Sequence, residues 1–556
     1  MSRSDSLFPS RHDLPTAVEN PPVVHRDDVV LSKGRLALVN SHLTPREAQV
    51  ADLLFIRRAF DEAAIEYLLV RGNDDRPLLV VDRSQRKRVR QALTQASADE
   101  PFYAKPADGV RRSVALLADG HFADKSSRAI ILFRPRVTPR GGLRYGAANG
   151  VRLEFWTIGE DTVLIPAPNS LTRTTVPVGE LVRTTVERYG ETWPTIEGMF
   201  DKHASDIDFD IDIVFSWVDG ASIEWQRARA RRMKSYVVGE GDDSHARFRQ
   251  LDELKYALRS VNLFAPWIRN VYIVTDSPRP EWLAEHPRVT IVPSEKFFAD
   301  TSVLPTHNSH AVESQLHNID GLAEHFLYSN DDMFFGRPVG PEEFFSPGGV
   351  SKFIEATTRI GLGGSNVDRS GFENAARVNR ALLADRFGAV ITRHLEHTPA
   401  PMRKSVVREL EAEFPEEFAR TAASRFRSAT DISVTNSLYH YYALLTGRAV
   451  TVTDVRALYV DTTARVGLVA MRKLLRRRDA DLFCLNDGSF PEISDEDRAD
   501  AVRDFLEGYF PIVAPWERAV GADGADLNGA DLNRADVNVN GAVPEASGGS
   551  GQLIHG

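Results

Sequence analysis

The amino-acid sequence predicts an α/β fold with a largely parallel sheet, preceded by a smaller α+β unit. Between residues 211 and 332, short apolar runs typical of buried strands alternate with amphipathic segments of helical period, which indicates βαβ units. Between residues 44 and 190, helical and strand-like segments occur without any catalytic signature. We therefore expect the chemistry in the second unit and an accessory role, in acceptor binding or assembly, for the first.

Four regions follow from these patterns. Residues 1–43 are polar, contain proline and show no sustained period, which predicts a flexible N-terminus. Residues 44–190 are the α+β accessory domain, and residues 205–510 are the α/β domain. Residues 521–556 are of low complexity and repeat a short motif that begins at Ala525, Ala530 and Ala535. Three such short repeats bury little core, so we expect a disordered tail rather than a β-solenoid.

The composition excludes several classes of protein. The chain has 556 residues, 42% hydrophobic and 26% charged, which is typical of a multidomain globular protein. It contains no run of about 18 apolar residues, so no transmembrane segment is expected. The formal net charge of −10 argues against a nucleic-acid partner. A single cysteine, Cys484, excludes an internal disulfide, and with the polar N-terminus it favours a cytoplasmic location.

In the α/β unit, the expected strands lead into polar residues. We expect strands at 213–218, 271–275, 289–292 and 326–329, and helices at 224–236, 251–263, 311–319, 402–413, 415–423, 431–445 and 495–508. Short strands are expected at 450–453 and 457–460. Asp219, Asp276 and Asn330-Asp331-Asp332 each come at or directly after the end of a strand. Ligands of open parallel sheets bind beyond the carboxyl ends of the strands, so these side chains are expected at one site.

Two of these motifs carry specific chemistry. Asp331 and Asp332 offer hard oxygen ligands for Mg²⁺ or Mn²⁺ beside substrate phosphates, although acidic pairs also end strands without any ligand. Asp219 and Gly220, after Trp217, are interpreted either as a nucleotide-binding turn or as an ordinary turn. No phosphate-binding loop of the ATPase type and no nucleophile elbow occurs in the sequence.

Histidines suggest two different sites. His307, His310 and His317 lie close together in sequence, but their spacing is not that of the helix motif of zinc proteases, so zinc is the weaker reading. His394 and His397 precede basic residues, a setting that suits a general base acting on a phosphorylated substrate.

Two arginines offer a phosphate clamp. Arg425 and Arg427 lie in Ser424-Arg-Phe-Arg-Ser428, and a guanidinium binds two phosphate oxygens at once. Solvated surface charges are the alternative reading.

Taken together, the motifs resemble those of the Stealth family of sugar-1-phosphate transferases. Those enzymes act in bacterial capsules and exopolysaccharides, and an animal member starts the mannose-6-phosphate tag of lysosomal glycoproteins. Matches occur in family order over residues 211–490, about half of the chain: Ile211-Asp-Ile-Val-Phe-Ser-Trp-Val-Asp-Gly220, Asp252-Glu-Leu-Lys-Tyr-Ala-Leu-Arg-Ser260, Leu304-Pro-Thr-His-Asn-Ser309, Phe326-Leu-Tyr-Ser-Asn-Asp-Asp332, His397-Thr-Pro399 and Cys484-Leu-Asn-Asp487. The sequence departs from the family pattern at Ala221-Ser222, where an acid is usual, and at His310, where a proline is usual.

The resemblance implies a glycosyltransferase-A-like, Rossmann-like mixed sheet with helical insertions. It also implies transfer of a sugar together with its phosphate from a UDP-sugar donor to a polysaccharide or oligosaccharide hydroxyl, with release of UMP. The cofactor would be Mg²⁺ or Mn²⁺.

The resemblance further implies roles for individual residues. His397 would be the general base, Arg427 the phosphate clamp and Asp332 a catalytic metal ligand. The metal would be held by Asp331, Asp332, Asn486 and Asp487. Substrate would be bound by Trp217, Asp219, Gly220, Arg259, Asn308, Ser309, Glu313, His317 and Asn330. His307 and His317 are the next candidates for the base.

Two other functions stay open at this point. A glycosyltransferase of the same core fold would release UDP instead of UMP, and a catalytically inactive homologue would only bind sugar. The sequence also leaves open homo-oligomerisation and peripheral association with the inner face of the membrane.

Overall fold

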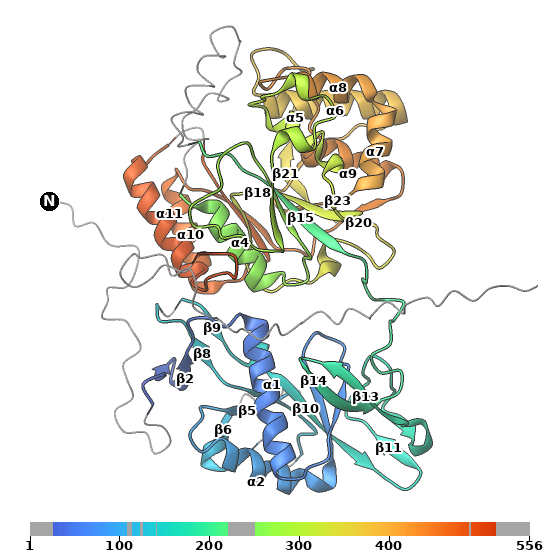
Figure 1. The fold of residues 1–556 in the computed structure, drawn as a ribbon, viewed down its shortest axis with the longest axis vertical. Coiled ribbons are helices and arrows are strands. Elements are labelled where there is room, and N and C mark those ends of the chain that lie inside the picture. The colour runs from blue at the N-terminus through green and yellow to red at the C-terminus, as the bar shows by residue number, and fades with distance from the viewer. Residues whose placement is uncertain are drawn as a thin grey trace, which may run out of the picture.

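A computed structural model of the chain describes residues 26–107, 114–122, 126–140, 142–220, 251–488 and 491–518. Figure 1 shows two bodies, a β-rich N-terminal unit below and an α/β unit above it. The predicted α/β class with a separate N-terminal α+β part is confirmed by these elements. Within the described part of the chain, no helix is both long and apolar enough to cross a lipid bilayer.

The N-terminal unit is built around an eight-stranded sheet. Helix α1 (Pro45–Glu62) begins at a capping box formed by Thr44 and Glu47, and it packs with α2 (Arg86–Ala96). The sheet has the order β12-β11-β10-β7-β5-β6, with β4 pairing β10 and β3 pairing β4. Its strands are β3 (Leu68–Val70), β4 (Leu78–Asp82), β5 (Tyr103–Pro106), β6 (Ala115–Leu116), β7 (Ala129–Phe133), β10 (Val151–Ile158), β11 (Thr162–Leu164) and β12 (Thr175–Pro177). A hairpin of β13 (Arg183–Arg188) and β14 (Glu191–Ile196) completes the unit.

One sequence prediction about this unit is wrong in part. The segment predicted to be flexible up to residue 43 contains the strands β1 (Val29–Ser32) and β2 (Arg35–Val39). They form a second sheet with β8 (Arg136–Val137) and β9 (Arg144–Tyr145), in the order β1-β2-β8-β9. Val29, Leu36 and Leu38 are buried together, so packing on a distant strand pair orders a segment whose local pattern is weak. Residues 1–25 of that prediction and the predicted tail lie outside the described residues.

The α/β unit centres on a five-stranded sheet with the order β17-β16-β15-β18-β23. β15 (Ile211–Ser216), β16 (Val271–Val274), β17 (Val289–Val292) and β18 (His325–Asn330) are parallel, and β23 (Ala400–Arg403) is antiparallel. Helix α4 (Glu253–Phe264) follows β15 in the described chain and buries an apolar face against the core. The predicted strands are therefore present, whereas the predicted helix at 224–236 lies outside the described residues.

A small second sheet extends the core. It has the order β19-β26-β25, with β19 (Met333–Phe335) antiparallel and β25 (Ala457–Asp461) parallel to β26 (Leu482–Asn486). This pairing places the chain at 484–487 beside the acidic residues that follow β18. Helices α10 (Arg465–Arg477) and α11 (Asp495–Tyr509) lie next to this sheet.

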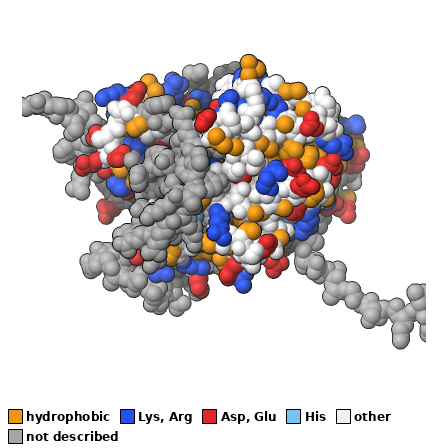
Figure 2. All heavy atoms as spheres, turned by 90° about the horizontal axis from the view of Figure 1, so that it is seen from above, with side chains coloured by type: hydrophobic (Ala, Val, Ile, Leu, Met, Phe, Trp, Pro, Cys, Tyr) orange, Lys and Arg blue, Asp and Glu red, His pale blue; other side chains and the backbone are white. Residues whose placement is uncertain are grey.

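The helical insertions form the upper lobe in Figure 1. The predicted helix at 311–319 is shorter than expected: α5 (Ser309–Glu313) ends and a 3₁₀ turn at 316–318 follows. The remaining elements are β20 (Ser351–Phe353), β21 (Glu355–Arg359), α6 (Gly371–Phe387), β22 (Arg393–Leu395), α7 (Lys404–Glu413), α8 (Pro415–Ala423), a π-helical turn at 434–438, α9 (Tyr439–Leu445) and β24 (Ala449–Thr451). On the face shown in Figure 2, basic, acidic and apolar side chains are interspersed.

Candidate active site

The carboxyl ends of β15 and β18 lie side by side, since Ser216 pairs with Asn330 in register. The chain after β15 is held down by two hydrogen bonds: the Trp217 amide donates to the Val274 carbonyl at 3.2 Å, and the Asp219 amide donates to Ser277 Oγ at 2.9 Å. The polar turns that follow β15, β16 and β18 thus lie at the same edge of the central sheet, as the strand pattern predicts.

An acidic cluster occupies the adjoining edge. Cys484 Sγ lies 3.4 Å from Asp332 Oδ2 and donates to it, and Asp332 Oδ1 is buried without a hydrogen-bond partner. The cluster also includes Asp331, Glu253 at the start of α4, Asp461 at the end of β25, and Asp487 after β26. One cation, Arg498, forms an ion pair with Asp487.

Burial and mutual repulsion alter the acidity of this cluster. Burial, with the negative charges of Glu253 and Asp487, raises the pKa of Asp332 to about 7. Burial, with the charge of Asp331, raises the pKa of Glu253 to about 7. Among the described residues, carboxylates thus outnumber cations in this cluster.

These residues fit a divalent cation. Hard carboxylate oxygens are the ligands that Mg²⁺ prefers, and a buried oxygen with no hydrogen-bond partner is one such donor. Asp487 already has partners, because its Oδ1 accepts from Thr462 Oγ1 at 2.7 Å and forms an ion pair with Arg498. Among the described residues, no three His, Cys, Asp or Glu side chains converge as a ready-made metal site.

The aromatic ring of Tyr459 lies between His397 and the acidic cluster. His397 sits between β22 and β23, and its ring packs edge-on against Tyr459, with centroids 5.4 Å apart. Tyr459 pairs in register with Cys484. Burial, and then the charges around Asp461 and Asp332, raises the pKa of Tyr459. Burial lowers the pKa of His397, so the imidazole stays neutral near pH 7.

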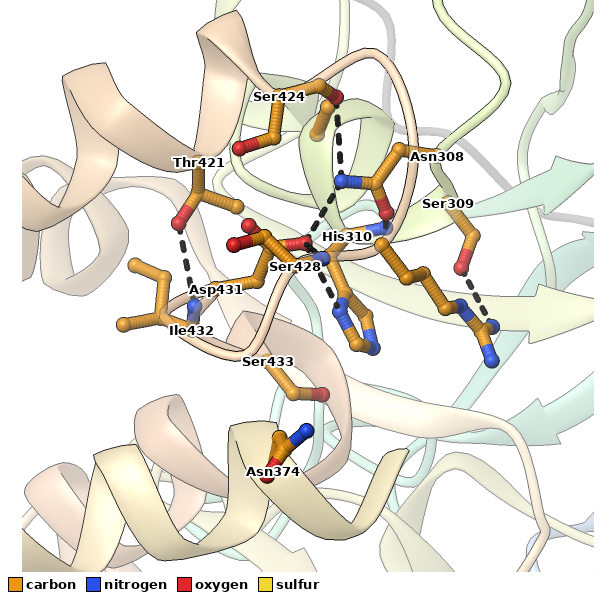
Figure 3. Close-up of polar contacts among 12 residues, drawn as sticks. Asn308, Ser309, His310, Asn374, Thr421, Ser424, Ser428, Asp431, Ile432 and Ser433 are labelled. Atoms are coloured by element: carbon orange, nitrogen blue, oxygen red, sulfur yellow. Dashed lines mark hydrogen bonds and ion pairs between the residues drawn. The ribbon is translucent and has the colours of Figure 1, made fainter. Parts of the chain in front are cut away.

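Arg427 is held on the other side by a network of polar contacts, and Figure 3 shows the part of it around Asn308, Ser309 and Asp431. Its Nη2 donates to Ser309 Oγ at 2.9 Å. The loop that carries it is fixed by Asn308, whose Nδ2 donates to Asp431 Oδ2 at 2.8 Å and to the Ser424 carbonyl at 3.1 Å. Asp431 also accepts from the Ser428 amide at 2.8 Å. Asn308 and Ser309 therefore position the loop and the guanidinium.

Tyr328 connects the two sides. This fully buried phenol donates to Asn330 Oδ1 at 3.0 Å. Burial raises its pKa, and the charges of Glu313, Arg427 and Asp331 all act on it. Asn330 is therefore held between the Arg427 network and the acidic cluster.

Three predicted substrate ligands already have partners within the protein. Arg259 donates twice to Glu517 at 2.7 Å and once to the Phe510 carbonyl at 2.9 Å, so its guanidinium holds the C-terminal segment. Glu313 is buried and accepts from Thr435 Oγ1 at 2.7 Å. His317 is buried against Glu411, with Nε2 and Oε2 2.7 Å apart.

The same contacts bear on the zinc alternative. His317 faces Glu411, whereas His310 Nδ1 lies 3.8 Å from Asp431. The two side chains thus have different partners, and zinc gains no support. His307 stacks on Phe426, with ring centroids 5.4 Å apart, close to the Arg427 loop.

Sequence reasoning missed four residues of this region: Glu253, Tyr459, Asp461 and Arg498. Asp461 follows an expected strand, the signal that identified Asp331, and could have been found. Glu253 lies on a helix, and Arg498 reaches Asp487 from α11. Only the tertiary packing reveals them.

Comparison with known proteins identifies the family of the chain. Models of the conserved regions of Stealth proteins match at residues 209–237 (region 1), 247–353 (region 2), 396–444 (region 3) and 472–524 (region 4). The exopolysaccharide phosphotransferase CpsY of Mycobacterium tuberculosis (strain ATCC 25618 / H37Rv) is 59% identical over 491 residues, covering 88% of this chain and 92% of the relative. The chain belongs to the Stealth family.

Other Stealth relatives carry similar names. The exopolysaccharide phosphotransferase of Nocardia farcinica (strain IFM 10152) is 55% identical over 480 residues, covering 86% of this chain and 89% of the relative. Among solved structures, the chain is similar to the galactosyltransferase LgtC, with 12% identity and a TM-score of 0.28 over 55% of this chain and 96% of that chain. The predicted family is confirmed, and with it the predicted enzyme class, a phosphotransferase.

Proposed function

We propose that the chain transfers a hexose 1-phosphate from a UDP-sugar to a hydroxyl of a glycan and releases UMP, in exopolysaccharide synthesis. The names of the Stealth relatives support the pathway. The observation that carries the reaction class is the placement of a neutral histidine, an acidic cluster and a fixed guanidinium around one sheet edge.

The bonds of the proposed reaction balance as follows. The acceptor oxygen attacks the phosphorus that bears the sugar, and a new P–O bond forms. The bond from this phosphorus to the oxygen bridging to UMP breaks, and UMP leaves with that oxygen. The bond between sugar C1 and its oxygen is untouched, so the anomeric configuration is kept.

His397 takes the proton of the acceptor hydroxyl. An imidazole whose pKa lies below its ordinary value of about 6.5 is neutral at pH 7 and can accept that proton. The packing of His397 on Tyr459 fixes the ring beside the acidic cluster.

Arg427 binds phosphate oxygens of the donor. A guanidinium held by Ser309 on a loop fixed by Asn308 is already oriented, so little side-chain entropy is lost when phosphate binds. It stabilises the charge that moves toward the departing UMP.

Asp331 and Asp332 would hold Mg²⁺ or Mn²⁺, with Asn486 and Asp487 at the neighbouring strand end. Such a cation neutralises phosphate charge and orients the phosphates when bound. We further propose a cytoplasmic location at the inner face of the membrane, which the free, buried thiol of Cys484 suits.

Identification of the leaving nucleotide tests this proposal. The protein is incubated with a panel of UDP-sugars, Mg²⁺ and candidate glycans, and nucleotides are separated by chromatography. UMP in equal amount to a phosphodiester product detected by mass spectrometry supports the proposal. UDP with a phosphate-free glycoside would instead identify a glycosyltransferase.

A further inference from the structure

A basic hollow lies in the N-terminal unit, apart from the residues described above. It has a volume of about 400 Å³ and is bordered by β1, β2, β5, β8 and β9. The described residues that line it include five cationic side chains and no acidic one: Lys33, Arg35, Lys105, Arg136 and Arg144. Phe133 and Tyr145 form apolar parts of its wall. A volume of this order suits a small ligand or one or two sugar units.

The five cations differ in how they can serve a ligand, and Lys33, Arg35 and Lys105 are the ones on which binding would depend. Arg136 is buried and donates to both oxygens of Asp52, at 2.7 and 3.2 Å, so its charge is already balanced. Lys33, Arg35 and Arg144 are exposed, and Lys105 is half-buried.

The backbone presents these cations from fixed positions. Lys33 and Gly34 are the two turn residues of the β1–β2 hairpin, and both have positive φ, of 48° and 75°. The turn therefore places Lys33 and Arg35 on the same rim of the hollow. Arg144 comes from β9, which reaches β2 through β8. The side chain of Arg144 is exposed, but partial burial of its guanidinium still lowers its pKa.

The hollow is tied to the α/β unit through the strand that bears Arg144. Leu143 and Tyr145, on either side of it, belong to the same buried cluster as the strands of the central sheet. Arg478, at the end of α10, donates to the Gly142 carbonyl at 3.0 Å. A chain bound in the hollow is thus held by a wall that is fixed to the catalytic unit.

We propose that this hollow binds a phosphodiester group of the acceptor glycan, away from the site of transfer. The proposal rests on the proposed function: each transfer adds a phosphodiester, so an acceptor that has received sugar phosphates carries anions along its length. Concentrated cations in a concave site bind such anions by charge-assisted hydrogen bonds. A concave shape favours a discrete glycan segment over a flat lipid surface.

The test measures binding by calorimetry in the full-length protein, without donor or metal. The probe is a synthetic disaccharide joined through a phosphodiester. The same sugars in a neutral glycosidic link, inorganic phosphate and phosphatidylglycerol vesicles are compared with it. The variant is Lys33→Gln/Arg35→Gln, and the matched control is Lys87→Gln/Arg90→Gln, two exposed cations of α2 outside the hollow.

We expect the hollow variant to bind the phosphodiester probe at least about 10-fold more weakly, and the control to bind it as the wild type does. Binding within twofold of wild type in the hollow variant would overturn the proposal. Equal binding of the neutral disaccharide or of inorganic phosphate would overturn the glycan assignment. So would vesicle binding that the same substitutions abolish.

Kinetics separate this proposal from the proposed function. With a short neutral acceptor, the hollow variant should release UMP at the wild-type rate, whereas with a phosphodiester-bearing acceptor its KM should rise about 10-fold at unchanged kcat. An equal loss with both acceptors would contradict a remote binding site. Failure of the wild type to release UMP would refute the proposed function and leave the binding result intact.

Discussion

At the scale of single residues, the placement of His397 against Tyr459 allows the base to be tested. We predict that His397→Ala lowers kcat by roughly 10²–10⁴, the usual contribution of a general base, while the donor still binds. Because burial lowers the pKa of His397, kcat/KM of the wild type should fall only below about pH 6.5, as the imidazole gains a proton. Rates and calorimetry from pH 5 to 8 check both points. Near-wild-type turnover in the variant would move the base to His307, which lies near the Arg427 loop.

Asp332 allows a test of the metal at the same scale. We predict that a chelator abolishes activity and that Mg²⁺ restores it. Mg²⁺ should raise the Tm of the wild type by mass action but leave the Tm of Asp332→Asn unchanged. Asp208→Asn, a surface carboxylate paired with Lys202, is the control and should respond as wild type does. Full activity in excess chelator would contradict the prediction.

Gly371 lies against the side chain of Arg427, the proposed phosphate clamp. A Cβ at this position would stand 2.7 Å from Cβ and Cδ of Arg427, closer than carbon atoms approach. Gly371→Ala should therefore displace Arg427 and lower kcat/KM about 10-fold, with weaker donor binding. Gly364→Ala, whose added Cβ meets nothing within 4 Å, should leave kcat/KM unchanged. Wild-type donor affinity in Gly371→Ala would show that the position of the Arg427 side chain does not depend on the space left by Gly371.

At the scale of elements, α9 carries a buried histidine that predicts acid sensitivity. His440 is fully buried beside Phe353, and burial lowers its pKa to about 3. Between about pH 6.5 and pH 3, His440 is protonated in the unfolded chain but stays neutral in the folded chain. Stability attributable to His440 is thus lost as pH falls, by about 1.4 kcal/mol per pH unit once pH is well below 6.5.

His440→Gln removes this titrating group. Urea unfolding of the wild type and of His440→Gln from pH 7 to 4.5 should show a smaller loss of stability in the variant. Parallel pH profiles of the two proteins would contradict the prediction.

At the scale of the whole molecule, Arg478 joins the two units. It is half-buried, lies 4.1 Å over the Tyr509 ring, and donates to the carbonyls of Gly142, Tyr509 and Gly508. Arg478→Ala leaves three acceptors without this donor and should destabilise the protein by about 2–4 kcal/mol. Arg140→Ala breaks only an exposed pair with Glu507 and should cost less than about 1 kcal/mol.

Thermal melts and limited proteolysis of both variants measure the difference. Faster cleavage between the units in Arg478→Ala than in Arg140→Ala is the expected pattern. Equal melts of the two variants would show that Arg478 does not couple the units.

The sequence by itself determined the four parallel strands of the central sheet, the acidic pair that follows β18, and the family, but not the antiparallel strand β23. These features depend on residues that are neighbours in the sequence. A short apolar run predicts a buried strand without knowledge of the strands it pairs with, and a family motif is a stretch of consecutive residues. The N-terminal strands β1 and β2 escaped sequence reasoning because a distant strand pair orders them.

Only the tertiary structure decided which side chains meet. Arg259 and Arg427 look alike in sequence, yet one is bound by Glu517 and the other faces Ser309. Tyr459 and Cys484 become neighbours through strand pairing, and Tyr459 then contacts His397 while Cys484 contacts Asp332. These partners are separated by up to about 260 positions, and packing of whole elements, rather than any local preference, brings such residues together.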